Sequence, residues 1–296
     1  MIVLFLIGIF SVAGLAMAMT PSFEEDISDA KSDAEVNDED VRDELLSVSE
    51  NIEAGGQENS SILDFARVAV DAQTEAGEPD STQAGSDDMD TIAGGDTNDL
   101  IEGNAGADEL LGEAGNDTID GGSGDDIISG ADGEDVLIGG TGDDALHGRN
   151  DNDLLQGDAG EDTLLGGNGD DTLIGFDDNE DYLIGGDGDD VILVGQGDVT
   201  YGGHGEDTFF LDAMGDDIGS KEVANFSDFN SEDDLIVVCV NSDQADAVLS
   251  MVVSEADPSQ SELQINGHTL ALLSTENAPD LDDINVLVSE GLPLTA

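Results

Sequence analysis

The sequence predicts an all-β protein: a parallel solenoid of nonapeptide repeats, preceded by a disordered segment and closed by a small β-rich C-terminal cap. Three observations predict this. A glycine-rich nonapeptide recurs from Gly85 onward, an aspartate holds the sixth position of each unit, and an aliphatic residue holds the eighth. A fixed short period over many units indicates a repeat architecture in which each unit packs on its neighbours.

The repeat is regular over ten consecutive units, which begin at Gly85, Gly94, Gly103, Gly112, Gly121, Gly130, Gly139, Gly148, Gly157 and Gly166. The eighth position is Ile or Leu in all ten, from Ile92 to Leu173. After an irregular stretch the pattern resumes with Asp190 and Asp207. We therefore place the repeat region at residues 85–210.

Each half of a unit has its own predicted structure. Residues 121–126, Gly-Gly-Ser-Gly-Asp-Asp, form a turn, because glycine adopts positive φ without a Cβ penalty. Residues 127–129, Ile-Ile-Ser, fit a three-residue strand whose central aliphatic side chain faces inward. Two units then make one coil, and successive coils pair in parallel at roughly 4.8 Å.

Coils of eighteen residues stack the sixth-position aspartates, for example Asp108 above Asp90 and Asp126 above Asp108. Such carboxylates repel each other unless a cation lies between them. Carboxylates and turn carbonyls are hard oxygen ligands, which Ca²⁺ binds in sets of about 6–8, whereas Mg²⁺ prefers a smaller octahedral site and softer metals prefer Cys or His. We expect several Ca²⁺ ions, with these candidate ligands: Asp90, Asp99, Asp108, Asp117, Asp126, Asp135, Asp144, Asp153, Asp162, Asp171, Asp190 and Asp207.

The pattern Gly-Gly-x-Gly-x-Asp-x-aliphatic-x is complete at residues 139–147 and 166–174. In this motif the chain resembles the RTX, or hemolysin-type, calcium-binding repeat family. The resemblance implies a right-handed parallel β-roll with calcium between successive turns. It also implies that the aspartate carboxylates and the backbone carbonyls of the glycine-rich stretch hold the ions.

Some units depart from the pattern. The fourth position is Asp88, Thr97 and Asp151 in three units, and β-branched Thr97 is expected to strain its turn, because such residues resist left-handed backbone. Residues 175–184 form a unit of ten that lacks the glycines, although Asp181 could still serve. Residues 194–201 form a unit of eight with no aspartate in place. We expect a bulged, calcium-poor rung there.

Composition excludes several partners. Five Lys and Arg against 72 Asp and Glu give a formal net charge of −67, which argues against nucleic acid and against anionic membrane surfaces. Self-repulsion on this scale opposes compaction, so calcium is expected to be a folding partner. The single cysteine, Cys239, lies in an apolar run, where we expect a small buried side chain.

The N-terminal part is expected to carry an export signal. Residues 1–19 are uncharged and apolar, and Ala16-Met17-Ala18 has the form of a signal-peptidase site, so we assign residues 1–18 to a signal peptide. A retained membrane anchor formed by residues 1–19 is the alternative. Either way we expect a secreted or extracellular protein. Residues 19–84 form an acidic disordered linker. Within it, residues 61–70 form either a transient amphipathic helix or a docking segment.

Residues 211–296 are expected to form the cap. Strands are predicted at 208–211, 235–240, 247–253, 263–265, 269–273 and 284–288, with a hairpin at Asn266-Gly267. Residues 223–237 are similar to the segment that follows the repeats in RTX proteins. This resemblance implies a type I secretion signal and the corresponding secretion machinery as a partner.

No catalytic constellation is evident: His147, His204 and His268 lack partners at motif spacing, so we expect no enzymatic activity. The expected function is calcium binding with a structural or surface role. The alternatives are an adhesin, acting on a cell surface or extracellular matrix, and the non-catalytic part of a secreted enzyme. Outward-facing positions seven and nine are irregular, so we expect a scattered, solvated surface without the flat array of an ice binder.

Overall fold

The computed structural model describes residues 81–177, 179–195, 197–213, 223–241, 247–281 and 284–289. The predicted signal segment, almost all of the predicted linker and the candidate helix at 61–70 lie outside these residues. Every regular element in the described part of the chain is a β-strand, which confirms the all-β prediction. None of the described residues forms a helix that could cross a membrane.

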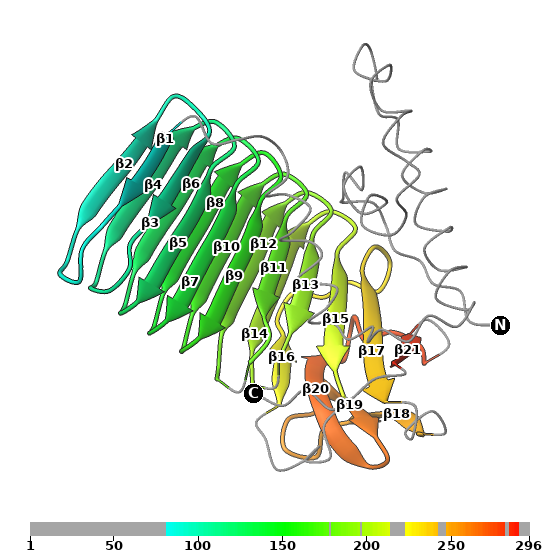
Figure 1. Cartoon of the computed structure of the whole chain (residues 1–296). Coiled ribbons are helices and arrows are strands. Elements are labelled where there is room, and N and C mark those ends of the chain that lie inside the picture. Colours follow the sequence, from blue (N-terminus) through cyan, green and yellow to red (C-terminus); the bar gives the residue numbers. More distant parts are fainter. Residues whose placement is uncertain are drawn as a thin grey trace, which may run out of the picture. The chain divides into compact units, whose positions relative to one another are not determined.

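The strands form two sheets, and up to β17 they alternate between them (Figure 1). The ten-stranded sheet contains β1 (Ser81–Ala84), β3 (Asp99–Glu102), β5 (Thr118–Ser123), β7 (Val136–Thr141), β9 (Leu154–Ala159), β11 (Thr172–Gly175), β13 (Val191–Val194), β15 (Thr208–Asp212), β17 (Leu235–Asn241) and β21 (Asn285–Ser289). The eleven-stranded sheet contains β2 (Thr91–Gly95), β4 (Glu109–Ala114), β6 (Ile127–Asp132), β8 (Ala145–Asn150), β10 (Thr163–Asn168), β12 (Tyr182–Asp187), β14 (Val199–His204), β16 (Ala224–Phe226), β18 (Leu249–Val253), β19 (Gln260–Ile265) and β20 (His268–Ser274).

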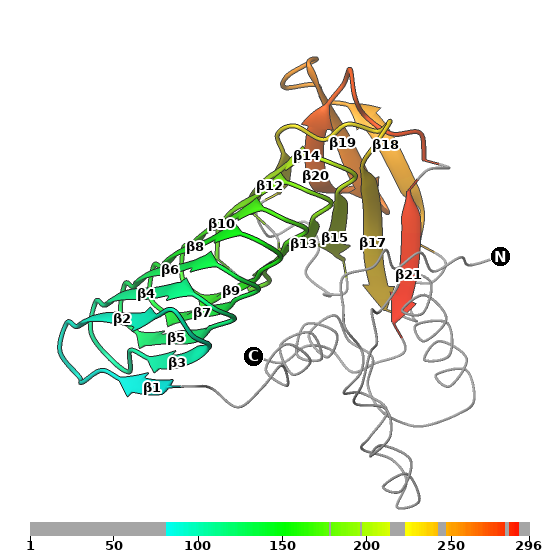
Figure 2. The ribbon, with the colours of Figure 1, turned by 90° about the horizontal axis from the view of Figure 1, so that it is seen from above.

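The register confirms the coil predicted from the repeat. Within the solenoid each strand pairs in parallel with the strand one coil further on, as Thr118 of β5 does with Val136 of β7. Seen from above, successive coils rise as a stack of rungs (Figure 2). The ten-residue and eight-residue units fall in consecutive coils, where Thr163 pairs with Tyr182 and Tyr182 with Val199. Their length changes cancel, and the predicted register resumes.

The strands are longer than predicted. A typical strand such as β5 has six residues and includes the first three positions of the next unit. The turn is therefore confined to positions four to six. Second-position residues in the regular units mostly have left-handed φ, whether glycine, as at Gly122 (98°), or not, as at Ala131 (96°). This conformation kinks the chain within a strand that continues. The glycine content had suggested a turn over the whole first half of the unit.

The core is a narrow column of the eighth-position aliphatic side chains. Ile92 of the first unit is partly buried, and those that follow are at most 1% exposed: Ile101, Leu110, Ile119, Ile128, Leu137, Leu146, Leu155, Leu164, Leu173 and, beyond the regular units, Leu183 and Ile192. At the C-terminal end aromatic residues widen the column. Phe209 packs edge-to-face on Phe226 and Phe229, with ring centroids 5.1 Å and 6.0 Å away.

The cap continues both sheets beyond the repeats. Strand β16 pairs in parallel with β14, and β17 pairs in parallel with β15. Strands β19 and β20 form an antiparallel hairpin whose turn residues Asn266 and Gly267 have φ of 51° and 84°, which confirms the hairpin predicted there. Strand β16 was not predicted, because three residues give too short a pattern to recognise.

The solenoid begins four residues before the first predicted unit, within the stretch assigned to the linker. Gln83 of β1 pairs with Ile101, so a polar side chain occupies the core column at its first rung. Its Nε2 donates a 2.8 Å hydrogen bond to the carbonyl oxygen of Ala93 in β2. This contact links the first strands of both sheets and gives the end of the core a polar closure.

The outer faces of the two sheets differ in how exposed their apolar side chains are. The face of the ten-stranded sheet corrects the expectation of a solvated surface. On the eleven-stranded sheet, Ile127 and Tyr182 are 60% and 47% exposed. On the ten-stranded sheet, eight apolar side chains that lie outside the core cluster are nevertheless buried: Val136, Leu154, Ile174, Val191, Leu193, Phe210, Val237 and Cys239. The irregular outward pattern of the early units did not reveal this second apolar face, which begins at β7.

Candidate metal centre

The aspartates that precede the strands form two stacks, one at the start of each sheet's strands. The first Asp ladder precedes strands of the eleven-stranded sheet and contains Asp90, Asp108, Asp126, Asp144, Asp162, Asp181 and Asp198. The second Asp ladder precedes strands of the ten-stranded sheet and contains Asp99, Asp117, Asp135, Asp153, Asp171, Asp190, Asp207 and Asp234.

One hydrogen bond repeats at every step of both ladders. The backbone N–H of each aspartate donates to Oδ1 of the aspartate one coil further on. The distance is 2.7 Å from Asp126 to Asp144 and 2.8 Å from Asp153 to Asp171. This bond ties each coil to the next and fixes the orientation of each carboxylate, since a carboxylate held by a backbone donor cannot rotate freely.

The other carboxylate oxygen has no such partner. Oδ2 is buried and accepts no hydrogen bond in Asp99, Asp108, Asp117, Asp126, Asp135, Asp144, Asp153, Asp162, Asp171, Asp181, Asp190 and Asp207. These side chains are at most 3% exposed. Buried polar atoms are nearly always paired, and a buried unpaired charge is strongly destabilising, so a row of such oxygens indicates a site for cations.

The first-position glycines keep this space free for oxygen atoms. A Cβ on Gly121 would lie 2.5 Å from Oδ2 of Asp126 and 2.7 Å from the carbonyl oxygen of Gly139 in the next coil. Gly139 stands in the same relation to Asp144, at 2.5 Å, and to the carbonyl of Gly157, at 2.8 Å. Glycine is needed at these positions because any side chain would collide with a carboxylate and a backbone carbonyl. Carboxylate and carbonyl oxygens therefore gather between consecutive coils.

Burial makes the ladders poor places for uncompensated negative charge. Loss of solvation, followed by repulsion from neighbouring ladder aspartates, raises the pKa of Asp153 and of Asp190 to about 9. The same loss of solvation raises the pKa of Asp135 and Asp171 to about 7. At neutral pH the carboxyl groups of Asp153 and Asp190 therefore ionise readily only if positive charge is supplied.

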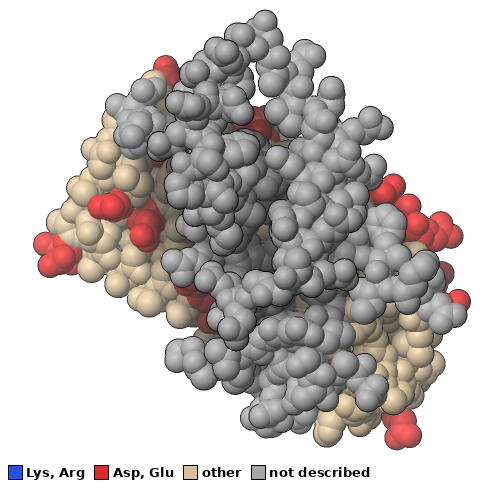
Figure 3. Space-filling model, turned by 45° about the vertical axis from the view of Figure 1, so that its right-hand side comes forward, with Lys and Arg blue, Asp and Glu red and all other residues tan. Residues whose placement is uncertain are grey.

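The chain itself supplies almost no positive charge here. Arg149 is the single Lys or Arg within the described ranges, and its Nε donates to Ser129 Oγ. The described surface on the face drawn in Figure 3 shows acidic groups and no basic ones. Carboxylates and carbonyls without a basic partner match the oxygen ligand set that Ca²⁺ prefers.

Side chains alone do not complete a metal site. Within residues 81–289, as far as they are described, no group of three or more His, Cys, Asp or Glu is placed to hold a metal ion. The donor set implied by the repeats differs from such a cluster, because it combines two aspartates with backbone carbonyls. Asp126 and Asp144, with the carbonyl oxygens around Gly121 and Gly139, are representative of the residues that would hold one ion.

Eleven of the twelve aspartates proposed from the sequence have the unpaired buried Oδ2; the exception is Asp90, whose Oδ2 accepts hydrogen bonds from the N–H and Oγ of Ser86. Three further aspartates join the ladders. Asp181 takes the ladder position for which the sequence offered it, Asp198 corrects the expectation that residues 194–201 have no aspartate in place, and Asp234 extends the second Asp ladder into the cap. A pattern that ignores the glycines, an aspartate followed two residues later by an inward-facing residue, would also have found Asp198 and Asp234.

The strain expected at Thr97 is absent, because Thr97 is not among the described residues with left-handed φ. Of the three fourth-position substitutions, only Asp151 is left-handed, at 69°. The strained residues lie mainly at the second position instead: Asn104, Glu113, Ala131, Arg149 and Asp158. Glycine is therefore replaced at the second position without loss of the fold.

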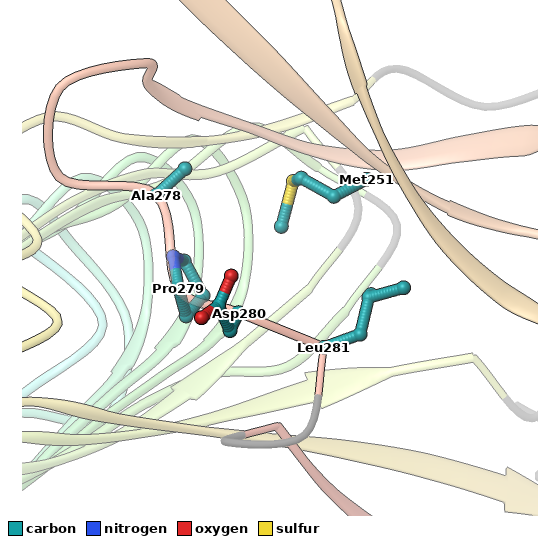
Figure 4. Close-up of a pocket in the computed structure, with 5 residues that line it drawn as sticks. All are labelled: Met251, Ala278, Pro279, Asp280 and Leu281. Atoms are coloured by element: carbon teal, nitrogen blue, oxygen red, sulfur yellow. The ribbon is translucent and has the colours of Figure 1, made fainter.

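No other described feature forms a reactive group. His147 is partly buried, His204 and His268 are exposed, and burial raises the pKa of the Cys239 thiol. A shallow hollow in the cap is lined by Met251, Ala278, Pro279, Asp280 and Leu281 (Figure 4). It offers one carboxylate among apolar groups and no nucleophile.

A parallel β-solenoid with buried, unpaired carboxylates between its coils is a cation-binding repeat protein. The model of the RTX calcium-binding nonapeptide repeat family matches residues 84–119, 111–146, 120–155, 147–179 and 177–200. Residues 84–200 are therefore RTX calcium-binding repeats, and the solenoid is the β-roll that the sequence predicted. No curated protein matches the chain significantly.

Proposed function

We propose that this chain is an exported calcium-binding β-roll that folds when it binds Ca²⁺ and has a structural role outside the cell. The observation that carries the proposal is the row of twelve buried Oδ2 atoms without hydrogen-bond partners. Calcium would supply the positive charge that these carboxylates lack. With a formal net charge of −67, the chain is expected to resist compaction until cations bind.

Folding on calcium is tested by circular dichroism of the full chain. Calcium titrated to millimolar concentration, the range in which extracellular calcium modules work, should produce β signal, and EDTA should remove it. Magnesium at the same concentration should produce little β signal, because it favours a smaller, octahedral and partly hydrated site. A spectrum unchanged by calcium and by EDTA would refute the proposal.

Export is proposed from two sequence features. The apolar residues 1–19 precede the acidic bulk of the chain, and calcium at the concentration required is found outside cells. Proteomics of intact cells and culture supernatant would locate the protein and identify its mature N-terminus. A mature chain that starts after Ala18 supports a cleaved signal peptide, retention of residues 1–18 in a membrane fraction supports the anchor, and a cytoplasmic chain contradicts export.

The proposed role outside the cell is non-catalytic. The exposed groups of the eleven-stranded sheet, such as Thr91, Glu109, Ile127 and Tyr182, do not repeat, so they do not favour an ice-binding array. An acidic calcium-loaded surface suits bridging to a cell surface or matrix, which is the adhesin alternative. Secretion through type I machinery is the alternative route of export and is tested by deleting the residues after the repeats and measuring export.

A further inference from the structure

The ends of the Asp ladders differ from their interiors. At three of the four ends, the oxygen that is unpaired elsewhere accepts a backbone N–H from its own turn. Oδ2 of Asp90 accepts from Ser86 at 2.6 Å, Oδ2 of Asp198 accepts from Gly195 at 2.7 Å, and Oδ2 of Asp234 accepts from Asn230 at 2.7 Å. None of these three has a buried Oδ2 without a partner.

Asp181 and Asp198 allow an unpaired and a paired Oδ2 to be compared directly. They are consecutive in the first Asp ladder, both are fully buried, and both lie in the irregular units. Oδ1 of each accepts the backbone N–H of the preceding ladder aspartate, at 2.9 Å for Asp181 and 3.1 Å for Asp198. They differ only at Oδ2, which is unpaired in Asp181 and bound to the Gly195 N–H in Asp198.

A backbone N–H and a cation compete for the same oxygen. The N–H presents partial positive charge along the lone-pair direction, so a carboxylate saturated by backbone donors needs no ion and offers it fewer free lone pairs. A buried carboxylate oxygen without such a donor needs a cation to balance its charge. The unit that contains Asp181 also contributes Asp177, whose Oδ2 accepts from the N–H of Gly160 in the preceding coil at 3.4 Å. A second carboxylate thus approaches the same gap where the usual glycines are missing.

We propose that the calcium array extends through the irregular unit to Asp181, and that Asp90, Asp198 and Asp234 are metal-free closures at which backbone N–H groups replace the ion. This inference rests on the proposed function, since it assigns which aspartates of the same array bind calcium. It adds Asp181, which lies outside the family's repeat pattern, to the calcium ligands. It also states at which aspartates the array ends.

The test compares Asp181→Asn with Asp198→Asn in the full chain at saturating calcium. Native mass spectrometry counts bound ions as whole numbers. Asp181→Asn should bind at least one ion fewer than the wild type, whereas Asp198→Asn should bind the same number and melt at a lower temperature. Equal losses in both variants, or a full count in Asp181→Asn, would overturn the inference. A wild type that binds no calcium would instead refute the proposed function.

A second measurement covers the case in which Asp181→Asn fails to fold. The chain has two tyrosines and no tryptophan, and Tyr182 directly follows Asp181. Tb³⁺, a hard cation that substitutes for Ca²⁺, emits when a nearby excited tyrosine transfers energy to it. Tyr182→Phe should remove most of this emission, while Asp198→Asn should retain it. Emission that survives Tyr182→Phe unchanged, or disappears in a folded Asp198→Asn chain, would contradict the inference.

Discussion

The backbone N–H of Asp153 donates a 2.8 Å hydrogen bond to Oδ1 of Asp171, while Oδ2 of Asp171 is buried without a partner. The same side chain therefore stabilises the stacking of coils and creates a demand for positive charge. A protein with this arrangement has two ways to satisfy it: a cation between the coils, or protons on the carboxyl groups.

Acid should substitute in part for calcium. Burial raises the pKa of Asp153 to about 9 and of Asp162 to about 6, above the roughly 3.9 of an unfolded aspartate. The folded state then binds more protons than the unfolded state. The resulting stability is complete below about pH 4 and is lost as the pH rises through about 6 to 9. In EDTA, the β signal in circular dichroism should therefore be largest at acid pH and should decline over that window.

The control for this prediction is Asp153→Asn, which imitates the protonated side chain. In EDTA it should keep its β signal to a higher pH than the wild type does, and the pH dependence of that signal should be weaker. In saturating calcium it should bind fewer ions. A β signal in EDTA that does not change between pH 5 and pH 9 would contradict the assignment of raised pKa values to the ladders.

An interior aspartate should matter more than one at the edge. Asp126→Ala removes the acceptor for the buried Asp108 N–H, and an unsatisfied buried donor costs about 1–3 kcal/mol. It also interrupts the stack, which a repeat array tolerates less well than fraying at one end. Asp90→Ala removes an acceptor only for Ser86, in the same turn, and should cost under about 1 kcal/mol. The measurement is the calcium midpoint of folding, and equal shifts would argue against a cooperative stack.

The first-position glycine should be required for space rather than for backbone conformation. Gly121→Ala places a Cβ 2.5 Å from Asp126 Oδ2 and 2.7 Å from a backbone carbonyl, so overpacking of about 1–3 kcal/mol is expected. Gly95→Ala is the matched control, because Gly95 has a φ of 125° but no atom within 4 Å of the added Cβ. Gly121→Ala should raise the calcium midpoint more. A larger effect at Gly95 would mean that conformation dominates.

The sequence predicted the features that repeat. A strict period determined the coil length, the eighth-position residues of the core and eleven of the aspartates that have a buried, unpaired oxygen, because each is repeated in every unit. Features that occur once were harder to predict. Asp198 lies in the shortened unit 194–201, where the nine-residue register does not place an aspartate, Asp234 lacks the glycines that mark a unit, and Gln83 at the head of the core column resembles part of a polar linker.

The outer face of the ten-stranded sheet was missed for a different reason. Outward residues of the first units, such as Glu102 and Asp120, are polar, and they suggested a solvated surface throughout. From Val136 onward the same positions are mostly apolar and buried. Successive units belong alternately to the two sheets. Outward residues of the two faces are therefore interleaved in the sequence, and a gradual change along one face is hard to recognise there.

Strain from left-handed backbone should lie at Ala131 and not at Thr97. Ala131 has a φ of 96°, a conformation that costs a non-glycine residue about 1–3 kcal/mol, whereas glycine loses roughly 0.5–1 kcal/mol more chain entropy on folding. Ala131→Gly should therefore raise the melting temperature at fixed calcium and lower the calcium midpoint slightly.

Thr97 has no left-handed φ, so Thr97→Gly relieves no backbone strain and adds only the entropic cost. It should destabilise the roll by roughly 0.5–1 kcal/mol. Stabilisation by Thr97→Gly together with destabilisation by Ala131→Gly would show that the left-handed kink lies at the fourth position of the early units, and that the first coils are wound differently from the rest.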